Sequence, residues 1–120
     1  MSDPKRFGPD ARISRARLER MVEEATVDCY GEAEEAACLL DALEEHVLLP
    51  FSTTILTVTM SVVRFELTDR DDIVAICTRG GAHQAVPLVD LPLPSPLPHG
   101  AEWIDAYRLW ARVWAADDQE

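Results

Sequence analysis

The sequence lacks the segments and motifs that would place it in a membrane or in a familiar enzyme class. No apolar run reaches the roughly 20 residues that a membrane-spanning helix needs. The chain has no phosphate-binding glycine loop, no dinucleotide-binding glycine pattern and no EF-hand calcium loop. No nucleophile signature is present, and the first residues lack an apolar signal segment. We therefore expect a cytoplasmic protein that is not an enzyme and does not bind membranes.

Cysteine is scarce, with three residues at Cys29, Cys38 and Cys77. An odd number without paired spacing argues against a disulfide framework. The spacing also gives little support to a zinc site completed by His46, because structural zinc sites usually include at least one closely spaced pair of Cys or His ligands. We expect all three cysteines to be reduced residues of the core.

What the chain has in excess is acid. Asp and Glu number 22 against 11 Lys and Arg, which gives a net charge of −11. Residues 1–22 carry a net +3, so the rest of the chain carries −14. Such a body repels nucleic acid and anionic lipid, and it attracts cations and basic proteins. A charge that serves only solubility is the alternative interpretation.

The spacing of apolar residues predicts helices in the first part of the chain. Residues 1–12 hold prolines and a glycine among charges and should form a mobile basic tail, with residues 13–117 as a single acidic domain. Apolar spacings of three and four predict a helix near 14–29 and another near 32–48, separated at Tyr30-Gly31. The buried side of the second helix is predicted to consist of Ala36, Leu40, Leu43 and Val47.

Strands and a final helix are predicted for the rest of the chain. Residues 53–67, 73–78 and 83–89 are rich in apolar and β-branched residues and should be strands, joined by turns at 69–72 and 79–82. Because no helix separates them, they should form an antiparallel meander of three to four strands or a small barrel. Alternating prolines over 92–98 predict an extended connector. The predicted helix over 101–115 carries an aromatic stripe that should dock it on the sheet, so the fold class is α+β.

Carboxylates are the abundant candidate ligands, and calcium takes six to eight oxygens, mainly from such groups. At about 100° per residue, Glu34, Asp41 and Glu45 point away from the buried side of the second helix. Glu35 and Glu44 lie on its flanks, where they could meet ligands from another element. The turn at 69–72 supplies further carboxylates.

Several segments together resemble the cyanobacterial CcbP-type calcium-binding proteins. The matching pieces are Val27-Asp28-Cys29-Tyr30-Gly31, Glu34-Glu35, Leu43-Glu44-Glu45, Pro50-Phe51, Asp71-Asp72-Ile73-Val74 and Ala85-Val86-Pro87-Leu88. The closing helix with Trp110 is similar as well, so the resemblance covers roughly residues 23–112. The sequence departs from the family pattern at Ala33, where an acid is expected, and in the short segment 78–82.

The resemblance implies an α+β protein that binds Ca²⁺ without EF-hands. The acids that match the family pattern, and that it implies as metal ligands, are Asp28, Glu34, Glu44, Glu45, Asp71 and Asp72. The predicted function is therefore calcium binding, for buffering or sensing. The alternative is an acidic protein-interaction module that meets a basic partner and has no metal role.

Overall fold

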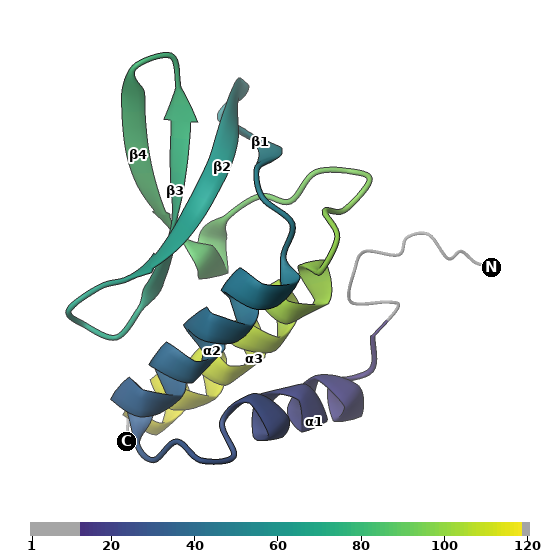
Figure 1. Cartoon of the computed structure of the whole chain (residues 1–120), viewed down its shortest axis with the longest axis vertical. Helices are drawn as coiled ribbons and strands as arrows, with labels where there is room; N and C mark the ends of the chain where they lie inside the picture. Colours follow the sequence, from purple (N-terminus) through teal and green to yellow (C-terminus); the bar gives the residue numbers. More distant parts are fainter. Residues whose placement is uncertain (1–12, 119–120) are drawn as a thin grey trace.

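The computed structural model describes residues 13–118, with side chains as far as Trp114. Its elements are α1 (Arg15–Ala25), α2 (Glu32–His46), β1 (Phe51–Ile55), β2 (Val58–Leu67), β3 (Ile73–Arg79), β4 (Ala82–Pro87), the 3₁₀ helix η3 (Leu88–Asp90) and α3 (Ala101–Asp118). Figure 1 shows the strands gathered on one side of the molecule and the three helices on the other. The predicted α+β class is confirmed, whereas the predicted tail at 1–12 lies outside the described residues. Within residues 13–118, no helix is both long enough and apolar enough to cross a membrane.

The first two helices are separated where the sequence predicts. Gly31 precedes α2 with a φ of 87°, a left-handed conformation that glycine adopts without a steric cost. The first helix is shorter than predicted, however, because it ends at Ala25. The hydroxyl of Thr26 donates to the Val22 carbonyl at 2.7 Å, and the chain then turns. Residues 26–31 therefore form a loop between α1 and α2.

The sheet is an antiparallel meander in the order β1-β2-β3-β4, with β1 and β4 at its edges, so it is not a barrel. The prediction of one strand over 53–67 is wrong, because β1 and β2 are joined by a tight turn at Leu56-Thr57. Both turn residues have positive φ, 50° and 68°. Sequences usually mark such a turn with Asn or Gly. Neither residue is present here, and the β-branched residues on both sides favour one continuous strand. The third predicted strand also ends early, at Pro87, where η3 begins.

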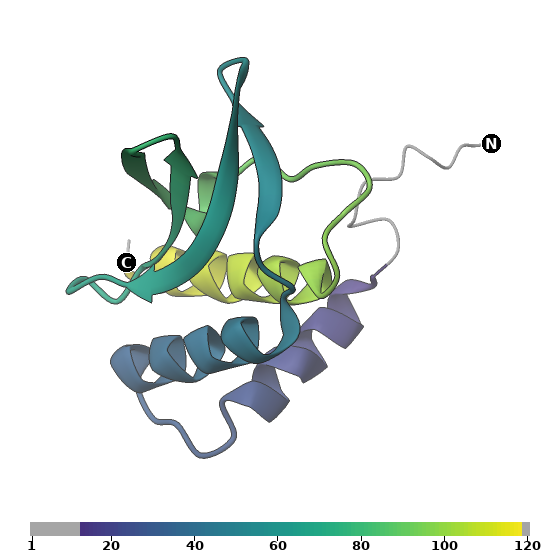
Figure 2. The same ribbon diagram turned by 45° about the horizontal axis from the view of Figure 1, so that its top comes forward.

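Helices α2 and α3 lie against one side of the sheet, and α1 packs against both of them, away from the strands (Figure 2). The core between these layers is built from Leu39, Leu43, Val62, Phe65, Ile73, Leu88, Ile104 and Tyr107. The prediction that Leu40 is buried is wrong, because Leu40 is only half-buried. Leu39 and Ala42 are buried in α2 instead. The aromatic stripe docks α3 on the sheet only in part, because Tyr107 bonds to the Ile73 backbone of β3. The tryptophans contact α2 instead, through Glu35 and His46.

The end of α2 and the start of α3 approach each other closely at Gly100. A Cβ atom on this glycine would lie 2.0 Å from the carbonyl oxygen of His46. Next to this contact, the Leu48 N–H donates to the His99 carbonyl at 3.0 Å. The approach sets the His46 ring flat against Trp103, with centroids 4.9 Å apart and an interplanar angle of 9°.

Candidate functional site

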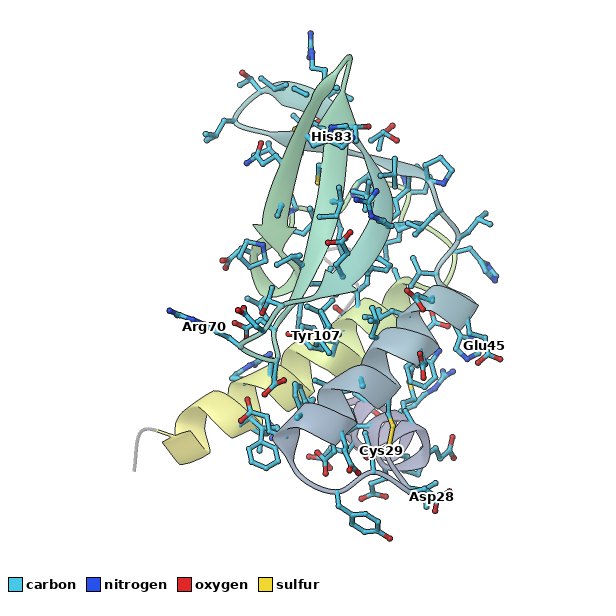
Figure 3. The ribbon with its side chains drawn as sticks, turned by 60° about the vertical axis from the view of Figure 1, so that its left-hand side comes forward. Asp28, Cys29, Glu45, Arg70, His83 and Tyr107 are labelled. Carbon is cyan, nitrogen blue, oxygen red and sulfur yellow. A yellow bond between two sulfur atoms is a disulfide. The ribbon has the colours of Figure 1, made fainter. Side chains whose placement is uncertain are left out.

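The six predicted ligands lie in separate parts of the surface. Asp28 lies in the loop 26–31, Glu34 in the first turn of α2, Glu44 and Glu45 in its last turn, and Asp71 and Asp72 in the turn between β2 and β3. Figure 3 shows Asp28, Glu45 and Arg70, which precedes Asp71 in that turn, at three well-separated places. Among residues 13–118, no three or more His, Cys, Asp or Glu side chains are grouped so that they could hold a metal ion as they stand. The ligand assignment therefore remains a prediction.

Two of the acids in α2 bond to the protein itself. Glu34 Oε1 accepts a hydrogen bond from the Tyr30 N–H at 2.9 Å, which ties the end of the preceding loop to the first turn of the helix. Glu35 Oε1 accepts from Trp110 Nε1 at 2.8 Å and from Trp114 Nε1 at 3.2 Å, which joins α2 to α3. Both carboxylates therefore stabilise the fold through these hydrogen bonds, and a cation would have to compete with the bonds for the same oxygens.

The turn 68–72 is closed by its own hydrogen bonds. The Thr68 N–H donates to the Asp72 carbonyl at 2.8 Å, and the Asp71 N–H donates to the Thr68 carbonyl at 3.0 Å. The Thr68 hydroxyl oxygen accepts from the N–H groups of Arg70 and Asp72, both at 3.2 Å. Two backbone carbonyl oxygens that could have joined a calcium shell are therefore already engaged within the turn.

Tyr107 lies beneath this turn, and the pKa of its phenol depends on the charge of the turn. Its hydroxyl oxygen accepts a hydrogen bond from the Ile73 N–H at 3.0 Å. Burial raises the pKa of Tyr107 most, the hydrogen bond from the Ile73 N–H partly offsets this rise, and the carboxylates of Asp72 and Glu32 add smaller increases. The turn is thus coupled to the core, and its charge favours the neutral phenol.

Three carboxylates do share one cavity, between α1 and α2. We call this cavity the acidic cleft; it is lined by Glu24 of α1 and by Asp41 and Glu45 of α2, and its volume is about 350 Å³. His46 and Trp103 lie at one end, and Cys38 lies in the wall. All three carboxylate residues are exposed. The chemistry of this donor set suits a hard cation, and the cleft has room for a partly hydrated one.

The sequence predicted only one member of this cleft. Glu45 belongs to the predicted set through the family resemblance, although helical geometry places it with Asp41 on the side of α2 that points away from the core. No signal in the sequence assigns a role to Glu24. The spacing of four between Asp41 and Glu45 is a signal that both lie on one side of α2. Nothing in the sequence shows that Glu24 lines the same cavity, because this depends on how α1 packs against α2.

Two of the three cysteines form a disulfide, Cys29 with Cys38. The prediction of reduced core cysteines is wrong for this pair and right for Cys77, which is free and buried. The chain reverses direction at Gly31, and this reversal brings the loop after α1 against α2. Burial raises the pKa of the Cys77 thiol. Cys29 and Cys38 are unavailable to zinc in this form, because a zinc ligand must be a thiolate.

Comparison with known proteins gives one structural likeness. No model of a protein family matches the sequence, and no curated protein sequence matches it. The fold is similar to that in the crystal structure of Anabaena CcbP, with a TM-score of 0.66, 18% sequence identity, and coverage of 82% of this chain and 91% of that chain. At this identity the likeness shows the fold alone, and it agrees with the architecture that the resemblance of the sequence implies.

Proposed function

We propose that the protein binds Ca²⁺ reversibly through surface carboxylates, for buffering or sensing, and that it is not an enzyme. The observation that carries the proposal is the acidic cleft, where Glu24, Asp41 and Glu45 from two helices line one cavity. The net charge of −14 over residues 23–120 supports it, because the field of the whole body concentrates cations at the surface. The CcbP-type resemblance of the sequence and the similar fold of Anabaena CcbP support the choice of calcium.

Calcium fits this cleft better than magnesium. Ca²⁺ accepts a variable number of carboxylate and water oxygens, whereas Mg²⁺ requires near-ideal octahedral geometry and releases its water reluctantly. The three side chains are exposed and must turn inward around the ion, which costs about 0.5–1.5 kcal/mol for each ordered side chain. We therefore expect a weak site, with a dissociation constant on the order of 10⁻⁴ to 10⁻³ M.

The remaining predicted ligands have different relations to the cleft. Glu44 is the neighbour of Glu45 in α2, and Asp28 is the neighbour of Cys29, whose disulfide partner Cys38 lies in the cleft wall. The turn with Asp71 and Asp72 is a separate region, and we propose it as a second, weaker place of cation contact.

The test is a calorimetric titration with CaCl₂ at constant ionic strength, combined with thermal melts. The variant Asp41→Asn/Glu45→Gln should bind at least about tenfold more weakly, which is a loss of roughly 1.4 kcal/mol. The control variant Asp69→Asn/Asp71→Asn removes the same charge from the turn and should bind almost as well as the wild type. At a tenfold excess of Ca²⁺ over the dissociation constant, the wild type should gain about 1.4 kcal/mol of stability.

Two results would contradict this account in different ways. A wild type that gives no heat and no change in melting temperature in millimolar Ca²⁺ would rule out calcium binding. Equal losses of affinity in the two variants would show that the charge of the body, and not the acidic cleft, attracts the ion.

A second candidate function is a protein-interaction module, favoured by the loop 26–31. Val27 and Tyr30 are 69% and 77% exposed and flank Asp28. Exposed apolar and aromatic side chains beside a carboxylate suit a basic peptide with an apolar residue. A Lys/Arg-rich peptide that binds the wild type in excess chelator, and binds Tyr30→Ala more weakly, would favour this function.

A further inference from the structure

The Cys29–Cys38 disulfide ties the loop that follows α1 to α2, next to the acidic cleft. Cys29 follows α1 in the loop 26–31, and Cys38 lies within α2. Cys38 also lines the cleft, together with Glu24 from α1 and Asp41 from α2. The bond therefore ties the loop that follows the helix with Glu24 to the helix that carries the other two carboxylates.

The loop that carries Cys29 has few other ties. The Cys29 N–H donates to the Thr26 carbonyl at 2.9 Å, and the Tyr30 N–H donates to Glu34 Oε1 at 2.9 Å. The first of these bonds lies within the loop, and the second joins only its end to α2. Asp28 and Tyr30, on either side of Cys29, are exposed, and Figure 3 shows Asp28 and Cys29 at one extremity of the molecule. The disulfide is thus a main constraint on the loop, and both of its cysteines are partly exposed.

We propose that this disulfide is reversible and that it sets the calcium affinity of the acidic cleft, which is higher in the disulfide form. The proposal rests on the proposed function. The reductant is a dithiol. One of its thiolates attacks a cysteine sulfur to form a mixed disulfide, and its second thiol resolves this intermediate. The dithiol becomes a disulfide, while Cys29 and Cys38 each gain one electron and one proton.

Affinity depends on the bond because three like charges must stay near one another before the ion arrives. The repulsion between Glu24 and the carboxylates of α2 favours separation of the two helices at this end. The disulfide opposes that separation, so in the oxidised protein only the three exposed side chains remain to be ordered around the cation. After reduction the ion itself must order the loop and the end of α1, and this lowers the affinity.

The expected location of the protein agrees with a reversible disulfide. In the cytoplasm, where the sequence leads us to expect the protein, stable structural disulfides are rare, and those that form are usually transient and redox-sensing. Cys77 differs from the pair because it is buried and its pKa is raised. A buried thiol of this kind is inert, so we assign redox exchange to Cys29 and Cys38 alone.

Binding and oxidation must influence each other equally. If the disulfide form binds Ca²⁺ more tightly by a given factor, Ca²⁺ shifts the thiol–disulfide equilibrium towards the disulfide by the same factor. For a two-electron couple, a tenfold difference in affinity corresponds to about 30 mV in reduction potential.

The experiment compares the CaCl₂ titrations of the oxidised protein and the dithiol-reduced protein. It is done in the Cys77→Ala variant, in which Cys29 and Cys38 are the only cysteines, and in the wild type. Reduction should weaken binding by about fivefold or more. The variant Cys29→Ala/Cys38→Ala should bind like the reduced protein and should not respond to the dithiol. In a dithiol redox buffer, CaCl₂ should increase the disulfide fraction, whereas MgCl₂ or NaCl at equal ionic strength should increase it less.

The outcomes separate this proposal from the function on which it rests. Equal affinity in the two forms, or tighter binding after reduction, overturns the switch and leaves calcium binding intact. A thiol count that finds Cys29 and Cys38 reduced in an oxidising buffer also overturns it. An oxidised protein that binds no Ca²⁺ overturns the proposed function, and the switch with it.

Discussion

The acidic cleft and the turn 68–72 are both rich in carboxylates, but they differ in which elements of the fold supply these groups. The turn places Asp69, Asp71 and Asp72 on one short segment, whose backbone groups bond to one another through Thr68. The cleft draws its carboxylates from two helices whose faces meet. A cation shell needs oxygens that approach from several directions. Acids on one short segment present their oxygens from one side, so a cation there needs a second element opposite them.

The two regions also differ in how they are held. At one end of the cleft, His46 stacks on Trp103 beside the close contact at Gly100. The Cys29–Cys38 disulfide lies along its wall. The turn instead rests on the core through the bond between Tyr107 and the Ile73 backbone. Each of these contacts can be removed by a substitution or by reduction, so the stability of the cleft and that of the turn can be tested separately.

The largest effect is expected from Gly100→Ala. The new Cβ would lie 2.0 Å from the His46 carbonyl oxygen, and φ at this residue is 87°, so the ends of α2 and α3 must move apart. We expect a loss of about 3 kcal/mol or more in the free energy of unfolding. The control is Gly81→Ala, because a Cβ there meets nothing within 4 Å. Urea denaturation that gives similar losses for both variants would contradict the close approach at the cleft.

Reduction of the disulfide should have the next largest effect. The pair is separated by 9 residues in sequence, and closing a loop of this size stabilises the folded state by about 2–3 kcal/mol in the chain-entropy account. Urea denaturation with and without a dithiol measures this loss. The variant Cys29→Ala/Cys38→Ala should be insensitive to the dithiol, and a wild type equally stable in both conditions would show that the bond contributes nothing to the fold.

The turn is tested by Tyr107→Phe, which leaves the buried Ile73 N–H without its acceptor. We expect a loss of about 1–2 kcal/mol in the free energy of unfolding. The pKa of Tyr107 is raised in the folded protein, so the neutral phenol stabilises the fold fully below its ordinary pKa of about 10. This contribution is lost as the pH rises through the folded-state pKa.

The advantage of the wild type over Tyr107→Phe should therefore shrink in alkaline solution. Urea denaturation of both proteins between neutral pH and about pH 11 measures it. Tyr30→Phe is the control, because Tyr30 is 77% exposed and its replacement should change little at any of these pH values. An advantage that stays constant above about pH 10 would contradict the assigned environment of Tyr107.

Local signals in the sequence predicted most of the elements and less of the site. The break at Gly31, the aromatic face of α3 and the antiparallel sheet follow from glycine conformation, helical spacing and strand order. The turn at Leu56-Thr57 was missed because neither residue is a usual turn former. The sharing of one cavity by Glu24 and Asp41, like the pairing of Cys29 with Cys38, arises from the way α1 and the loop after it pack on α2, which no local pattern encodes.

The most direct test of the account is a titration of the oxidised protein with CaCl₂, followed by the backbone amide signals in NMR at constant ionic strength. We predict saturable shifts concentrated at Glu24, Asp41 and Glu45, with smaller shifts at residues 69–72. Shifts concentrated at residues 69–72, or small linear shifts spread over all acidic residues, would contradict the assignment of the acidic cleft as the calcium site.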